Sequence, residues 1–237
     1  MTPRQSRLPS LSAALAGIPA GIQTVGPWGG RRQLFVRFAG EAETATIYTS
    51  DALRGELVRL TGRSRYHSVA IVGRDALVEE EFLSAAFTEA ITMPVMLDHD
   101  GQHPASLERL LARLALVQVT LDGSEGTAAL RHVHESIRLA ASKHVAHAVA
   151  LLPGDTTSDA PLLRIVEQLH EASEETQIVV HVTAAQASEH DRRWTLLLEQ
   201  AMRMHADVRV LPRWPATGSR RDGGAEPATH APVSTLN

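Results

Sequence analysis

The chain has 237 residues, and 43% of them are hydrophobic, which is enough to bury the core of one barrel-sized domain. Its formal net charge of -4 predicts no nucleic-acid partner, because phosphate binding requires concentrated Arg and Lys. The absence of cysteine excludes disulfides, thiolate zinc sites and cysteine-ligated iron–sulfur clusters. No run of about 18 apolar residues is present, so we expect no membrane segment and a cytoplasmic protein.

The two ends differ in composition from the middle. Residues 1–20 carry a mild apolar run that is broken by Pro19, and we predict an N-terminal extension rather than a signal peptide. The sequence leaves open whether this extension packs on the sheet. Residues 216–237 are rich in Gly, Pro, Ser, Thr and Ala, and we predict a disordered tail. One domain is therefore expected over residues 21–215.

Between these ends, short apolar runs alternate with stretches of helical periodicity. The predicted strands are Gln33–Phe38, Ser68–Val72, Pro94–Leu97, Leu116–Leu121, Ala146–Leu152, Gln177–Val182 and Asp207–Leu211. The predicted helices are Asp51–Leu60 after a Ser50 cap, Val78–Ile91, Pro104–Leu114, Thr127–Ser142, one from Ser158 to Ala172 and one from Ser188 to His205. This alternation indicates an α/β parallel sheet with crossover helices, either doubly wound or an incomplete (βα) barrel.

One segment carries a longer motif. Residues 26–40 read Gly-Pro-Trp-Gly-Gly-Arg-Arg-Gln-Leu-Phe-Val-Arg-Phe-Ala-Gly, and Glu41, Ala45 and Tyr48 follow in the spacing C-x3-C-x2-C. This stretch resembles the N-terminal strand and cluster loop of the radical S-adenosylmethionine (SAM) superfamily, above all the 7-carboxy-7-deazaguanine synthase family. The likeness can be followed in register from residue 23 to residue 212.

The resemblance implies an open, curved parallel sheet of about six to seven strands, an incomplete barrel with its cofactor at the C-terminal strand edge. It also assigns the three cluster-cysteine positions to Glu41, Ala45 and Tyr48. Because oxygen donors and a methyl group do not replace thiolates, we expect no iron–sulfur cluster and no radical chemistry. Residual SAM binding stays open, and no other cofactor is expected.

Four residues are candidates for ligand binding. Gln23 opens a segment that lies where the family has Q-G-E-G-P, and Arg74 and Asp75 lie where it has G-G-E-P-L, which grips the SAM amino group. Arg74 places a bulky cation where the family has a small residue. Trp28 would either stack on a planar ligand or cover the barrel mouth.

These observations lead to a degenerate radical SAM-like protein that acts as a non-catalytic binding or assembly subunit. The resemblance implies a homodimer or a heteromer with another protein, such as an active paralogue. A SAM or purine sensor that uses Trp28 and Asp75 is an alternative.

A second alternative is a metal-dependent hydrolase. In it, Asp98, Asp100, Asp122 and His181 would gather at the C-terminal strand edge and bind a divalent ion. The simpler interpretation of residues 98–101 is a polar turn whose Asp side chains accept backbone hydrogen bonds.

Overall fold

The computed structural model describes residues 11–41, 43–73, 76–154, 156–183 and 192–213. Within these ranges ten strands form one sheet in the order β10-β9-β8-β7-β6-β5-β3-β1-β4, and β2 pairs with β3. The strands are β1 (Ser12–Gly17), β2 (Ala20–Ile22), β3 (Arg32–Phe38), β4 (Thr46–Thr49), β5 (Ser68–Val72), β6 (Val95–His99), β7 (Leu116–Leu121), β8 (Ala146–Leu151), β9 (Gln177–Val182) and β10 (Val208–Pro212). The helices are α1 (Ser50–Thr61), α2 (Glu80–Ala86), α3 (Pro104–Leu110), α4 (Thr127–Ser142), α5 (Asp159–Ala172) and α6 (Arg192–Met204), with short 3-10 helices η1 (Ala76–Glu79) and η2 (Leu111–Arg113).

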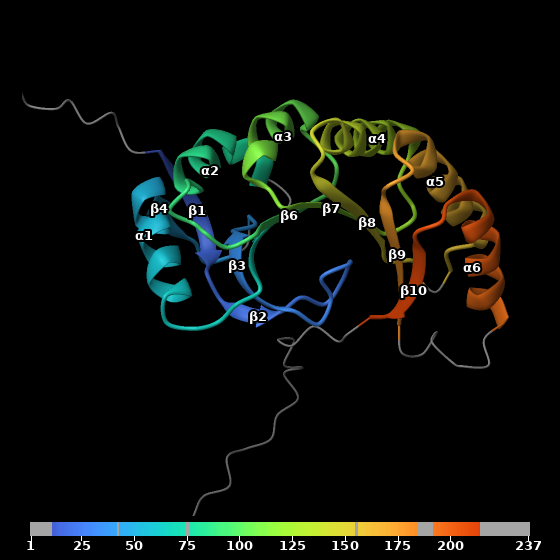
Figure 1. Ribbon diagram of the computed structural model, residues 1–237, viewed down its shortest axis with the longest axis horizontal. Coiled ribbons are helices and arrows are strands. Elements are labelled where there is room, and N and C mark those ends of the chain that lie inside the picture. The colour runs from blue at the N-terminus through green and yellow to red at the C-terminus, as the bar shows by residue number, and fades with distance from the viewer. Residues whose placement is uncertain (1–10, 42, 74–75, 155, 184–191, 214–237) are drawn as a thin grey trace, which may run out of the picture.

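The greater part of the sheet is parallel and curved. β3 and β5 to β10 pair parallel from neighbour to neighbour, whereas β1 and β2 run antiparallel to β3, and β4 antiparallel to β1. Figure 1 shows an open arc of strands with α1 to α6 along its outer side. A doubly wound sheet carries helices on both faces, so this arrangement is the incomplete barrel.

Alternation along the strands divides the side chains between two environments. Val69 and Ile71 of β5 pack outward in the main apolar cluster beneath the helices. Between them Ala70 points to the inner face, where it forms a small cluster with Met96 and Leu116. The helices bury a matching stripe, because apolar residues spaced by three and four positions share one helix face. The inner face of the sheet is therefore not needed for the main core, and it can carry polar side chains near the C-terminal ends of the strands.

All seven predicted strands form, with ends within two residues of the prediction. The helix predicted over Val78–Ile91 is shorter than expected, since η1 precedes α2 and α2 ends at Ala86. Thr49 caps α1 in place of Ser50, accepting a hydrogen bond from the amide of Ala52 at 3.2 Å. Ser188 lies outside the described residues.

The N-terminal segment joins the sheet. β1 lies between β3 and β4, and its Leu15 is fully buried. β1, which precedes the predicted boundary at position 21, thus belongs to the fold, because its backbone pairs antiparallel on both sides. Residues 1–10 and the predicted tail at 216–237 are outside the described part of the chain. Among the described helices none is long and apolar enough to cross a bilayer.

Candidate functional site

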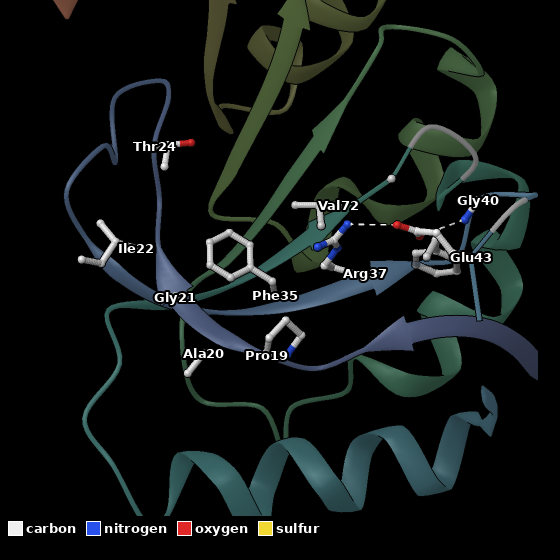
Figure 2. A pocket seen from close by; sticks show the side chains of 12 residues that line it. Pro19, Ala20, Gly21, Ile22, Thr24, Phe35, Arg37, Gly40, Glu43 and Val72 are labelled. Atoms are coloured by element: carbon white, nitrogen blue, oxygen red, sulfur yellow. Dashed lines mark hydrogen bonds and ion pairs between the residues drawn. The ribbon is translucent and has the colours of Figure 1, made fainter. Parts of the chain in front are cut away.

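A cavity of about 670 Å³ opens at the C-terminal ends of β3 and β5. Parallel strands collect their C-terminal loops at one edge, which is where ligands bind in sheets of this kind. Phe35 and Val72 give the cavity an apolar wall, and Gly21 of β2 lies against the Phe35 ring. Figure 2 shows the Phe35 ring between the β2 side, with Ile22 and Thr24, and the charged end of the cavity. The remaining lining residues are Pro19, Ala20, Arg37, Phe38, Gly40, Glu43 and Gly73.

The charged end of the cavity is an ion pair. Arg37 of β3 reaches Glu43 at 3.3 Å, and the other Glu43 oxygen accepts the amide hydrogen of Gly40 at 3.2 Å (Figure 2). About half of each side chain is exposed, at 51% for Arg37 and 45% for Glu43. Either side chain can therefore leave the other for a charged group of a ligand at little electrostatic cost. An aromatic wall with one such pair suits a planar ligand that carries a charged substituent.

The loop of residues 23–31, which folds into the barrel, supplies Thr24 to the lining of the cavity. Gly26 is its anchor: the amide N–H donates to Nε2 of His181 on β9 at 2.7 Å. Gly26 also has φ +77, and a Cβ at this position would overlap the amide oxygen of Gln118 on β7. A side chain here is strained by the positive φ and must displace the end of the Gln118 side chain.

A polar cluster continues from this anchor across the inner face. Gln118 Nε2 donates to one oxygen of Asp98 at 3.0 Å, and Thr120 Oγ1 donates to the other at 2.7 Å. Burial raises the pKa of Asp98 from 3.8 to about 6, although the two hydrogen bonds oppose this rise. In the sheet register Asp98 lies beside Val72 of the cavity wall. The Asp98 carboxyl group, with its pKa raised by burial to about 6, thus lies next to the cavity wall.

The three positions of the cluster motif do not form a metal site. Glu41 and Ala45 are exposed in the loop before β4, and neither supplies a thiolate. Tyr48 lies in β4 opposite Ala13 and packs against the main apolar cluster. Its side chain is used for packing.

The predicted ligand-binding residues have different positions. Gln23 is buried, and its Nε2 approaches the Met96 sulfur at 3.9 Å. Trp28 meets His67 edge-on, with ring centroids 4.8 Å apart, and packs on the small inner cluster. It does not line the cavity, and it covers the inside of the barrel near the start of β5. Arg74 and Asp75 lie outside the described residues.

The four residues of the alternative metal site have other partners in the described structure. Within the described ranges no group of three or more His, Asp or Glu side chains is placed to hold an ion. Asp100 accepts the amide of Gln102 at 3.0 Å, and Asp122 accepts the amide of Ser124 at 2.8 Å, so both close turns. Nε2 of His181 accepts the Gly26 amide hydrogen, and Asp98 accepts a hydrogen bond from Gln118 of β7. The polar-turn interpretation of residues 98–101 is confirmed at Asp100.

Sequence reasoning missed the residues that shape the cavity. Phe35 and Arg37 alternate with buried Leu34 and Val36 in a strand that was predicted correctly. An arginine on the inner side of a central strand is the signal that was available. The sequence does not indicate a role for Glu43, because its ion pair with Arg37 depends on the conformation of the loop after β3.

No protein-family model matches the chain, and no curated protein matches it. Among solved structures the chain is similar to a truncated form of 3-deoxy-D-arabino-heptulosonate 7-phosphate synthase from Thermotoga maritima. The identity is 10% over 85% of this chain and 84% of that chain, with a TM-score of 0.34. We base no conclusion on a likeness at this level, and the fold class rests on strand order and pairing.

Replacing Gly26 by Ala tests the loop anchor. Gly26→Ala adds backbone strain and an overlap with Gln118, whereas Gly30→Ala, at φ +80 with open space around it, adds strain alone. We expect a loss of about 1 kcal/mol for Gly30→Ala and about 3 kcal/mol for Gly26→Ala in urea unfolding. Equal losses in the two variants would show that the loop is not docked against Gln118.

The His181 hydrogen bond predicts an acid-sensitive stability. Burial lowers the pKa of His181 below 6.5, Arg213 acts in the same direction, and the Pro212 backbone partly opposes both. The unfolded chain therefore binds more protons below about pH 6.5, and the free energy of unfolding falls as the pH falls. His99, with its pKa lowered by burial to about 4, adds to this loss.

Asp98 acts in the opposite sense, because its raised pKa makes the folded state take up a proton as the pH falls through about 6. We expect His181→Gln, which keeps an acceptor but binds no proton, to flatten the decline between about pH 7.5 and 5.5. Asp98→Asn should steepen it. Urea unfolding at several pH values measures both, with exposed His132→Gln as control; unchanged slopes in both variants would contradict this assignment.

Proposed function

We propose that this protein is a degenerate radical SAM-like protein that serves as a non-catalytic binding subunit. One observation carries the proposal: a ligand-sized cavity lies at the C-terminal strand edge, directly beside a loop that has lost the means to hold a cluster. The cavity lining includes Gly40 and Glu43, which flank Glu41. Binding thus remains feasible where radical chemistry does not.

The arrangement of the edge supports this proposal. β3 and β5, which wall the cavity, are the strands whose following segments resemble the cluster loop and the SAM-gripping loop of the family. The segment after β2 that resembles the substrate loop supplies Thr24 to the same cavity. All three segments of the resemblance therefore meet at one place, although their functional residues have changed.

The lining indicates the ligand class. The Phe35 ring and Val72 favour a planar heterocycle, and Arg37 with Glu43 favours a charged or zwitterionic substituent. SAM and S-adenosylhomocysteine have both features, and guanine has the planar heterocycle alone. We assign the protein a ligand of this type, held without turnover.

Calorimetric titration with SAM, S-adenosylhomocysteine and guanine tests the assignment. We expect saturable heat from at least one of them and a loss of affinity of tenfold or more in Arg37→Ala, since a charge-assisted hydrogen bond contributes about 1.5–3 kcal/mol. Arg59→Ala is the matched control, because Arg59 pairs with Glu56 on the exposed side of α1. No heat with any of the three ligands, or equal weakening in both variants, would end the binding proposal.

The partner expectation concerns a different part of the molecule. β4 is an edge of the sheet in the described strand order, and its Ile47 is 68% exposed. An edge strand with an exposed apolar residue favours pairing with another chain. We propose a homodimer, or a heteromer with an active relative, formed through this edge.

Mass measurement by light scattering tests the homodimer. The full chain should dimerise at micromolar concentration, and Ile47→Lys should shift it to the monomer, because an inward or edge lysine opposes strand pairing. Val78→Lys, at a residue 60% exposed beside α2, is the control. A dimer that is equally stable in both variants would place the interface elsewhere.

A further inference from the structure

Two histidines meet at the end of the barrel opposite the cavity. His170 lies in the last turn of α5, and His205 follows the last residue of α6. α5 leads into the start of β9, and α6 leads into the start of β10. Both helices therefore end at this end of the barrel. The two imidazole rings have centroids 5.5 Å apart and are nearly perpendicular, at 78°.

The two ring nitrogens that face each other have the spacing of ligands to one metal ion. Nδ1 of His170 is 3.3 Å from Nδ1 of His205. An N–H···N hydrogen bond between the two rings is compatible with this distance. Two imidazole nitrogens at about 2.0–2.1 Å from a tetrahedral ion lie about 3.3–3.4 Å apart.

The other nitrogen of His205 is held as a metal ligand requires. Nε2 lies 2.6 Å from the carbonyl oxygen of Thr176, and since a carbonyl only accepts, Nε2 carries the hydrogen. Nδ1 of neutral His205 then presents a lone pair toward His170. Metal-binding histidines typically donate their second N–H to a carbonyl in this way, which orients the ring.

The surroundings favour a cation and leave a way in. The C-termini of α5 and α6 both point their partial negative charge at this corner. His205 is 1% exposed and fixed in place, whereas His170 is only partly buried and faces the solvent side of the pair. In the described part of the chain no third His, Asp or Glu completes the set, so water would fill the other positions.

We propose that His170 and His205 form a two-histidine site for a divalent transition ion of the Zn²⁺ type, which clamps the ends of α5 and α6 together. Imidazole is a preferred ligand of zinc, copper and nickel. Since water completes the coordination, the ion is exchangeable. The site is independent of the proposed ligand cavity, which lies at the other edge of the sheet.

Zinc titration against a chromophoric metal indicator tests the site, using the full chain without an affinity tag. The wild-type protein should bind one Zn²⁺ per chain at this site, and His170→Ala should weaken that binding at least about tenfold through loss of one of two ligands. His170→Gln, which keeps more of the packing, should behave alike. His132→Ala is the matched control, because His132 is an exposed histidine on α4 that bonds Gln102 and has no histidine partner in the described structure.

A second measurement separates the metal site from a simple hydrogen bond. With Zn²⁺ present, nitrogen-15 spectra of the imidazoles should show both Nδ1 atoms shifted and both Nε2 atoms protonated, and thermal unfolding should move to higher temperature in the wild type but not in His170→Ala. Binding of equal strength in the wild type and His170→Ala, or unmoved Nδ1 signals, overturns the proposal and leaves the pair as a hydrogen bond.

Discussion

The close approach of Gly26 to Gln118 and His181 is the contact on which the site depends. It brings together three segments that are far apart in the sequence and holds the loop of residues 23–31 inside the barrel. That loop carries Thr24 to the cavity wall, while Gln118 continues the contact to the Asp98 carboxyl. A side chain at position 26 would have to displace the end of Gln118 and adopt a strained positive φ, so the docked loop favours glycine here.

The C-terminal edge of the sheet gathers the loops that line the cavity. Parallel strands fix where these loops gather, and the apolar pattern of the strands and helices fixes the sheet. Chemistry at that edge depends on a few side chains, which change without disturbing the core. Glu41 and Ala45 are exposed, and Tyr48 packs against the main apolar cluster. A cavity with an aromatic wall and the Arg37–Glu43 pair remains.

The sequence predicted the parallel part of the fold because strands buried on both faces read as apolar runs, as in Ser68–Val72 and Leu116–Leu121. It did not reveal β1, whose small residues Ser-Ala-Ala-Leu-Ala-Gly become a strand only through pairing with β3 and β4. Contacts between distant residues were equally hidden. Asp98 and His181 were rightly singled out as polar groups near strand ends, but their partners at Gln118 and Gly26 decide their roles.

Anaerobic reconstitution with iron and sulfide, followed by incubation with SAM and a strong reductant, tests the central claim most directly. Our account predicts a colourless protein that binds no stoichiometric cluster and leaves SAM intact, because no residue of this chain supplies a thiolate. A brown preparation with about four irons per chain that cleaves SAM to 5′-deoxyadenosine would contradict the account.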